Sequence, residues 1–176
     1  EDTVKEAGFT PDERTLLTGD WAGYIRVWDY DQRTLIRALK QPGRVHSLLV
    51  YNENLAWASG EDGVLRLWDF QNGEVVNQLD VGVPLTELGI SRKNNLLIGL
   101  THSDRGQEAM IWDIVPDDSN PEPTLRLSLR EIIPGLDGGH DWNNQGGLSV
   151  SPDERFVAVG YTTGYIRVFE LESARE

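Results

Sequence analysis

Three histidines and pairs of adjacent carboxylates, such as Asp12-Glu13 and Asp153-Glu154, are the residues whose chemistry could support catalysis or hold a metal. His46, His102 and His140 are far apart, and none has a second ligand at the i, i+4 spacing of a helical metal site. Cysteine is absent, which excludes thiolate nucleophiles, disulfides and sulfur-based metal sites. No nucleophile elbow, phosphate-binding loop or dinucleotide fingerprint occurs. We therefore predict no catalytic residue, no metal and no cofactor.

The carboxylate pairs lie in a segment that the chain repeats. TPDER at residues 10–14 returns as SPDER at residues 151–155, an offset of 141 residues. At the same offset GYIRVWD, residues 23–29, returns as GYIRVFE, residues 164–170. A proline between a hydroxyl residue and an acid is typical of a tight turn. The recurrence favours a turn role for these acids over acid–base catalysis.

Trp-Asp pairs mark a longer series of units. Trp28, Trp68 and Trp112, each followed by aspartate, lie 40 and 44 residues apart, and Phe169-Glu170 follows 57 residues later. Between them, short runs of β-branched and aromatic residues alternate with turn residues, which predicts strands. The predicted strands are 4–9, 15–18, 24–28 and 35–39, then 45–50, 55–59, 64–68 and 75–79, then 85–90, 96–100, 109–112 and 125–129, and last 147–150, 156–159 and 165–169.

The third strand of each unit is apolar on both faces. Ile25 and Val27 point to one side of the first such strand, and Tyr24 and Trp28 point to the other. A sheet with one face in water would alternate more cleanly. Both faces therefore need cover, which radially stacked four-stranded sheets provide.

These units resemble the WD40 repeat family, through the segments IRVWD, LRLWD, MIWD and IRVFE and through ASGEDG in the second unit. The resemblance implies an all-β fold, a WD40-type β-propeller segment with three full four-stranded blades and three strands of a fourth. It also implies a non-catalytic scaffold that presents loops to protein partners. The alternative is a small-ligand-binding or enzymatic propeller with a site at the central channel. A partly buried histidine that faces that channel and has carboxylate neighbours would favour this alternative.

The resemblance also implies structural roles for motif residues. The family joins a histidine, a hydroxyl residue, a turn aspartate and the tryptophan by hydrogen bonds. Asp62 matches the aspartate in the second unit, with Ser59 and Trp68 near, whereas His140 matches the histidine in the fourth, so no unit holds the whole network. The motif residues are Trp28, Asp29, Asp62, Trp68, Asp69, Trp112, Asp113, His140 and Phe169.

We expect one propeller domain or partial propeller over residues 1–176. Its blades span about 4–40, 45–80, 85–130 with an insertion at 115–124, and 146–172 without an outer strand, and a long loop covers 131–146. An unpaired outer strand and bare end faces would need cover. The ring is expected to be completed by remaining blades of the same protein or, second, by another copy; a closed four-bladed ring is the third possibility.

The net charge of −13 and a pI near 4.6 disfavour a nucleic-acid partner and would attract a protein with a basic face. The alternative, which we prefer, is that the charge serves solubility alone. No apolar run is long enough for a membrane helix, so no membrane partner is expected. The absence of cysteine fits a reducing compartment, and we expect an intracellular protein, cytoplasmic or nuclear.

Large aromatic and arginine side chains in loops are the candidate partner-binding residues. Trp21, Arg44, Arg105 and Trp142 fall on the loops of one propeller face, and tryptophan and arginine often dominate binding energy. The same face is expected to include Asp20, Glu61, His102, Asp141 and Tyr161, whereas Trp57, in a second strand, is expected in the core. The alternative is structural: Trp21 would cover a neighbouring blade, and Trp142 would pack its own loop onto the ring.

Overall fold

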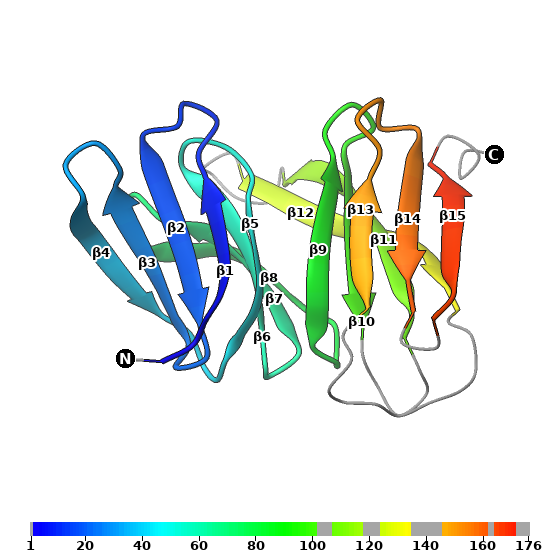
Figure 1. Cartoon of the computed structure of the whole chain (residues 1–176), viewed down its shortest axis with the longest axis horizontal. Coiled ribbons are helices and arrows are strands. Elements are labelled where there is room, and N and C mark those ends of the chain that lie inside the picture. The colour runs from blue at the N-terminus through cyan, green and yellow to red at the C-terminus, as the bar shows by residue number, and fades with distance from the viewer. Residues whose placement is uncertain (1, 102–106, 118–123, 135–145, 162–163, 172–176) are drawn as a thin grey trace. The chain divides into compact units, whose positions relative to one another are not determined.

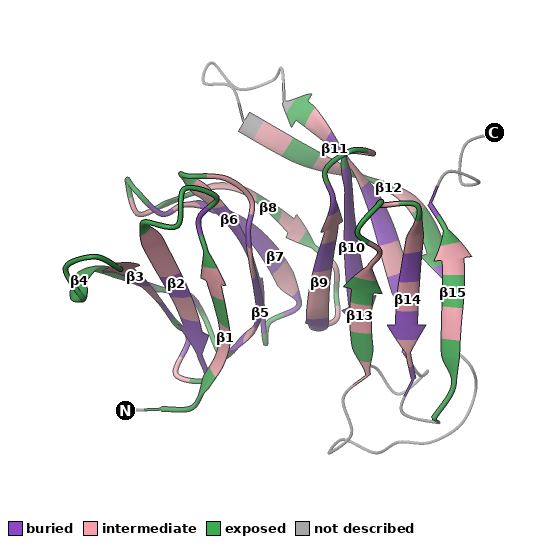
Figure 2. Ribbon diagram, turned by 45° about the horizontal axis from the view of Figure 1, so that its top comes forward, coloured by how far each residue is buried: buried purple, intermediate pink, exposed green. Residues whose placement is uncertain are grey.

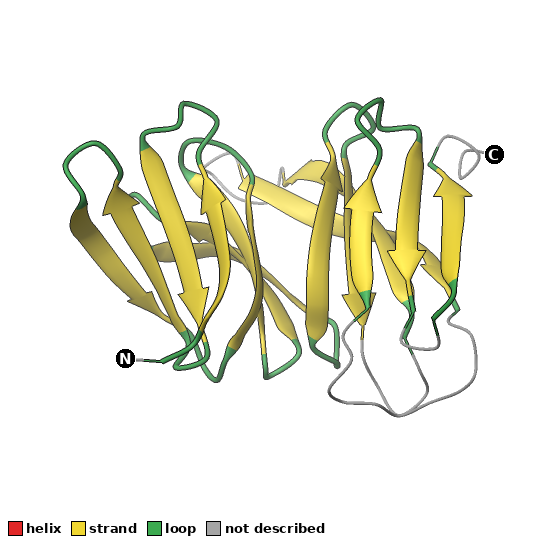
Figure 3. Cartoon of the chain, viewed as in Figure 1, coloured by secondary structure: helices red, strands yellow, loops and turns green. Residues whose placement is uncertain are grey.

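Strands account for every regular element in the part of the chain that the structure describes (Figure 3). The structure is a computed structural model, and it describes residues 2–101, 107–117, 124–134, 146–161 and 164–171. None of these residues forms a helix with the length and apolarity that a membrane span requires. The chain divides into two compact units, Glu1–Leu85 and Thr86–Glu176, and each is described by itself.

The first unit holds two antiparallel sheets of four strands, each strand paired with the next one in the chain (Figure 1). The strands of the first sheet are β1 (Val4–Phe9), β2 (Thr15–Asp20), β3 (Tyr24–Asp29) and β4 (Thr34–Lys40). Those of the second are β5 (Val45–Val50), β6 (Leu55–Gly60), β7 (Val64–Asp69) and β8 (Glu74–Asp80).

The second unit repeats this topology, except that its last sheet has three strands among the described residues. The third sheet consists of β9 (Leu85–Ser91), β10 (Leu96–Thr101), β11 (Ala109–Asp117) and β12 (Thr124–Ile133). The fourth consists of β13 (Gly147–Val150), β14 (Phe156–Gly160) and β15 (Ile166–Glu170). The strands therefore confirm the predicted three full sheets and three strands of a fourth.

Each unit has its core between its two sheets (Figure 2). In the first unit, alternate residues of β2 and β3 meet residues of the second sheet. This core contains Leu17, Ile25, Val27, Leu39, Val45, Leu48, Val50, Ala56, Ala58, Trp68 and Phe70. The core of the second unit contains Leu96, Ile98, Leu100, Ala109, Ile111, Ile133, Val157, Val159, Tyr161 and Leu171.

A β-bulge recurs immediately before the tryptophan of each Trp-Asp pair. The pairing shifts between Val27 and Trp28, between Leu67 and Trp68, and between Ile111 and Trp112. A bulge bends its strand and increases its twist. The extra residue belongs to the fourth strand each time, so the same bend recurs opposite the Trp-Asp pair in three sheets.

The third sheet departs from the predicted boundaries. β11 and β12 continue into the predicted insertion at 115–124, pairing Val115 with Arg126 and Pro116 with Leu125. Proline lacks an N–H, but β10 pairs with β11 only as far as Asp113, so Pro116 has a strand on one side alone. β12 also extends to Ile133, into the predicted long loop, of which residues 135–145 lie outside the described part.

β3 and β15, which share the sequence Ile-Arg-Val, differ in how far the same face of each strand is buried. Ile25 and Val27 are 0 % and 1 % exposed, whereas their equivalents Ile166 and Val168 are 73 % and 62 % exposed. In the first sheet it is the opposite face that is open, with Tyr24 36 % exposed. The expectation that both faces are covered therefore holds for one face of each of these sheets.

Candidate partner-binding surface

Three connections of the first unit carry the candidate residues. Trp21 lies in the turn between β2 and β3, Arg44 between β4 and β5, and Glu61 between β6 and β7. The β2–β3 turn is tight because Gly23 takes φ of 82°, and a Cβ there would approach the carbonyl oxygen of Gly43 to 2.1 Å. Glycine at this position lets the first turn approach the connection that carries Arg44.

The structure brings two of the four predicted binding residues into contact. The guanidinium carbon of Arg44 lies 5.2 Å from the centroid of the Trp21 ring, a cation–π geometry, and Trp21 is 41 % exposed. The Arg44 amide donates to Glu61 Oε2 at 3.3 Å, and the Glu61 amide donates to the Arg44 carbonyl at 3.0 Å. An aromatic, a cation and an anion thus share one exposed surface, which we call the Trp21–Arg44 surface.

A second cation–π cluster at Tyr24 was missed in the sequence. Arg26 Cζ and Lys40 Nζ lie 5.0 Å and 4.5 Å from the centroid of the Tyr24 ring, and Lys40 Nζ donates to the carbonyl of Ala22. The pairing of Tyr24 with Lys40 at the ends of β3 and β4 produces this contact. Only the strand register, which the sequence leaves open, could have revealed it.

Asp20 was expected on the exposed face, and this expectation is wrong. Its side chain is 1 % exposed and accepts a hydrogen bond of 2.9 Å from the Tyr24 amide while pairing with Arg26. Burial alone would raise the pKa of Asp20, but the Tyr24 amide and the Arg26 guanidinium outweigh it and hold the pKa below 3.8. Asp20 is therefore a charged anchor of the β2–β3 turn.

His46 on β5 is half-buried beside the same surface. Its pKa is lowered from 6.5, chiefly by burial; Glu61 opposes this, and the cations Arg44 and Lys5 add to it. Among the described residues, no group of three or more histidine, cysteine, aspartate or glutamate side chains could hold a metal ion. The Trp21–Arg44 surface thus has the side chains of a contact site, and the pKa of the neighbouring His46 responds to the charges of Arg44 and Glu61.

The structure describes only some of the other residues whose positions were predicted from the sequence. Arg105, Trp142, His102, His140 and Asp141 lie outside the described residues. Tyr161, expected on the loop face, is 6 % exposed and belongs to the core of the second unit, so this expectation is wrong. Trp57 is buried on β6, as expected.

The tryptophan motif residues use different local partners in different sheets. Trp28 Nε1 donates to Thr18 Oγ1 at 3.0 Å. In the second sheet Ser59 Oγ instead donates to the Leu85 carbonyl at 2.6 Å, and Trp68 Nε1 has no hydrogen-bond partner among the described residues. Trp112 is 1 % exposed, and Phe169 packs against the core of the second unit. Apolar packing is the feature that they share.

The motif aspartates fix turns. Asp29 accepts from the Gln32 amide at 2.8 Å, and Asp69 accepts from the Asn72 amide at 2.9 Å. Asp113 instead pairs with Arg130 of the neighbouring strand, which raises the pKa of that arginine.

Asp62 pairs with Arg66, with Arg66 Nη2 at 2.5 Å from Asp62 Oδ2, and this hydrogen bond is the main cause of the lowered pKa of Asp62. Neither Ser59 nor Trp68 takes part in that contact. The second sheet therefore has an ion pair in place of the polar network that the repeat family implies.

Comparisons with known proteins find one family model and several similar proteins. The WD domain, G-beta repeat family matches residues 1–29. The small ribosomal subunit protein RACK1y of Oryza sativa subsp. japonica is 28 % identical over 163 residues, 89 % of this chain and 44 % of that protein. The mitotic checkpoint protein BUB3.3 of Arabidopsis thaliana is 31 % identical over 75 residues, 43 % of this chain and 24 % of that protein.

Among solved structures, a chain in the crystal structure of the mitotic checkpoint complex is similar to this one. The TM-score is 0.77 at 18 % identity, over 96 % of this chain and 50 % of that chain. At this identity the likeness shows the fold alone. The chain spans less than half the length of the RACK1y and BUB3.3 proteins.

Proposed function

Because the chain belongs to the WD40 repeat family and has the fold of a β-propeller segment, we propose that it is a non-catalytic scaffold that binds protein partners. The observation that carries the proposal is the Trp21–Arg44 surface, where an exposed tryptophan lies under a guanidinium at 5.2 Å. Tryptophan and arginine are the side chains that most often dominate protein–protein binding energy.

The partner has a basic face at the contact. A net charge of −13 attracts cationic surfaces and speeds encounter with them. Glu61 places one of these negative charges beside Arg44, where it can receive a cation of the partner. Arg105 and Trp142, which lie outside the described residues, are further proposed partner-binding residues of the second unit. The cell compartment is intracellular, as for the relatives with ribosomal and mitotic checkpoint names.

In this proposal, further β-sheets pack against the exposed faces of the first and fourth sheets in the assembled protein. Ile166 and Val168 are more than half exposed, although their equivalents in the first sheet are core residues. Remaining sheets of the same protein, or a second copy, would bury them. Light scattering after gel filtration tests this cover: a stable monomer of this chain at 19.8 kDa with no tendency to associate contradicts it.

The binding proposal is tested by affinity capture followed by measured affinities. Proteins retained by the immobilised chain are identified, and the dissociation constant of the strongest is measured for the chain and its variants. Trp21→Ala and Arg44→Ala, and Trp142→Ala in the second unit, are expected to weaken binding about ten-fold or more. Tyr165→Ala removes another exposed aromatic and serves as the control. Equal affinity for all variants contradicts the proposed surface.

A further inference from the structure

The second unit shows how the repeated Pro-Asp-Glu turn is used. Glu154 Oε2 accepts hydrogen bonds from Ser91 Oγ at 2.9 Å and from the Lys93 amide at 2.7 Å. Asn94 Nδ2 donates to the Glu154 carbonyl at 2.9 Å. One glutamate of the fourth sheet thus holds the β9–β10 turn of the third.

The first sheet carries the same turn in the same conformation. Glu13 has φ of 60° and Glu154 has φ of 59°, both in the left-handed region that few non-glycine residues adopt. Asp12 Oδ1 accepts from Thr10 Oγ1 at 2.6 Å, and Asp153 Oδ1 accepts from Ser151 Oγ at 2.6 Å. The backbone therefore presents Glu13 as it presents Glu154.

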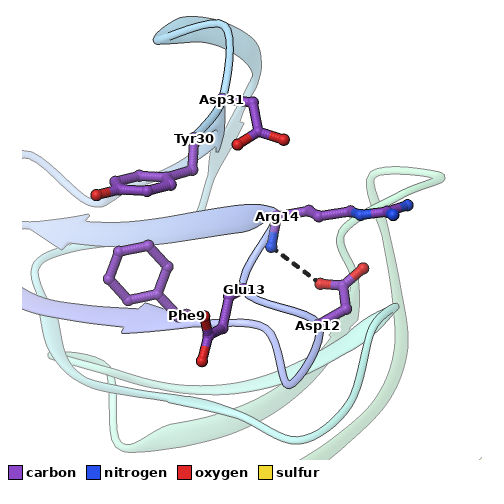
Figure 4. A pocket seen from close by; sticks show the side chains of 6 residues that line it. All are labelled: Phe9, Asp12, Glu13, Arg14, Tyr30 and Asp31. Atoms are coloured by element: carbon purple, nitrogen blue, oxygen red, sulfur yellow. Dashed lines mark hydrogen bonds between the residues drawn. The ribbon is translucent and has the colours of Figure 1, made fainter.

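Glu13 faces a pocket instead of a neighbouring turn. Within the described residues its carboxylate has no hydrogen-bond or ion-pair partner. The pocket has a volume of about 620 Å³, and Figure 4 shows its six lining residues, Phe9, Asp12, Glu13, Arg14, Tyr30 and Asp31. The carboxylate of Glu154 thus binds a neighbouring turn, whereas that of its equivalent, Glu13, is available to bind one.

The apolar part of the pocket is the counterpart of a buried region. Phe9 and Tyr30 meet edge to face, with ring centroids 5.0 Å apart, and are 48 % and 54 % exposed. Their equivalents 141 residues later, Val150 and Leu171, pack in the core of the second unit. The exposed rings therefore occupy positions that a neighbouring sheet covers elsewhere in the chain.

The negative charge of the pocket favours a neighbouring sheet whose turn is positively charged. Asp12, Glu13 and Asp31 outnumber the single cation, Arg14. The turn that Glu154 holds carries two cations, Arg92 and Lys93, between Ser91 and Asn94. The corresponding turn of the fourth sheet carries Asp153 and Glu154, so the fourth sheet of a second copy would bring like charge to the pocket.

We propose that the Phe9–Glu13–Tyr30 pocket docks a basic β-turn of a further sheet that is not a second copy of this chain. The Glu13 carboxylate accepts from a hydroxyl and a backbone N–H of that turn, and the two rings pack beneath it. This proposal rests on the proposed cover of the open faces and is independent of the Trp21–Arg44 surface.

A pair of cyclic peptides tests the proposal on the full chain. The first carries residues 89–97, which include the SRKNN turn, closed by a disulfide between added terminal cysteines. The second is identical except that the SPDER turn of residues 151–155 replaces SRKNN. In calorimetric titrations the first peptide is expected to bind and the second to bind at least ten-fold more weakly.

Variants of the chain then locate the site. Glu13→Gln and Tyr30→Ala are expected to weaken binding of the basic peptide about ten-fold each, while Glu53→Gln, an exposed glutamate outside the pocket, leaves it unchanged. Trp21→Ala is also expected to leave it unchanged, which separates this site from the partner-binding surface. Overturning results are no binding at millimolar peptide, equal binding of the two peptides, insensitivity to Glu13→Gln, or a dimer of the chain that Glu13→Gln dissociates.

Discussion

The guanidinium of Arg44 lies over the indole of Trp21, with its central carbon 5.2 Å from the ring centroid. Trp21 lies in the β2–β3 turn of the first sheet, and Arg44 lies in the connection between the first and second sheets, where its backbone is hydrogen-bonded to Glu61. Trp21 is 41 % exposed in this arrangement. The pair therefore holds a large aromatic surface in a defined orientation without burying it.

Arg44→Ala is expected to change stability little. An exposed cation–π pair contributes about 0.5–1 kcal/mol, so the free energy of unfolding measured in urea is expected to fall by no more than this amount. Val27→Ala, a truncation in the core of the same unit, is the comparison and should cost more. A loss above about 2 kcal/mol for Arg44→Ala would assign the pair to the fold instead of to recognition.

The equivalent residues Ile25 and Ile166 offer a matched test of the open face. Ile25→Ala removes a fully buried side chain and is expected to lower the free energy of unfolding by about 2–5 kcal/mol. Ile166→Ala truncates a side chain that is 73 % exposed, and a change within about 0.5 kcal/mol is expected. Chemical denaturation at several protein concentrations checks both values.

A large cost for Ile166→Ala would mean that the face is covered in solution. If that cost grows with protein concentration, self-association supplies the cover, because association makes stability depend on concentration. A large cost that does not change with concentration would contradict the exposed position of Ile166.

Most of the strand order could be read from the sequence because two periods act together. The repeat spacing locates each sheet, and the alternation within YIRVW or LRLW locates the third strand to within a residue. The predicted strand boundaries were wrong in the third sheet, where β11 and β12 pair within the predicted insertion, as at Pro116 and Leu125. The β11–β12 ladder continues past Asp113, the last residue of β11 that pairs with β10, and no local pattern encodes where it stops.

The site was accessible to sequence reasoning only in part. Trp21 was identified because a large aromatic is unusual in a loop, and Arg44 because arginine is enriched among residues that dominate binding energy. Their contact follows from two adjacent connections. Asp20 was expected at the surface because an aspartate at a turn is normally exposed, but the Tyr24 amide and the Arg26 guanidinium compensate for its burial. The Glu13 pocket required the comparison of two folded turns.

Asp20→Asn is expected to destabilise the first unit by about 3 kcal/mol, because it leaves Arg26 beside a neutral group in a largely buried pair. The pKa of Asp20 is below 3.8 in the folded chain. Its stabilising contribution is therefore complete above about pH 4 and is lost as the pH falls through the folded pKa. Thermal unfolding of both proteins across this acid range is expected to show a shallower pH dependence for Asp20→Asn.

The exposed Asp2→Asn is the control for acid titration, and it should retain the slope of the unmodified chain. Equal slopes for Asp20→Asn and the unmodified chain would show that the Asp20–Arg26 pair does not contribute to acid stability.

His46 connects the Trp21–Arg44 surface to pH. Burial lowers its pKa below 6.5, so on acidification from about pH 7 the unfolded chain takes up a proton before the folded chain does. The free energy of unfolding should therefore fall from about pH 7 down to the folded pKa, and His46→Gln should remove that share of the fall. Because Arg44 disfavours the imidazolium and Glu61 favours it, Arg44→Ala is expected to raise the pKa of His46 and Glu61→Gln to lower it. Titration of the His46 ring by NMR measures both shifts, and shifts of the same sign would contradict the placement of these two charges around the histidine.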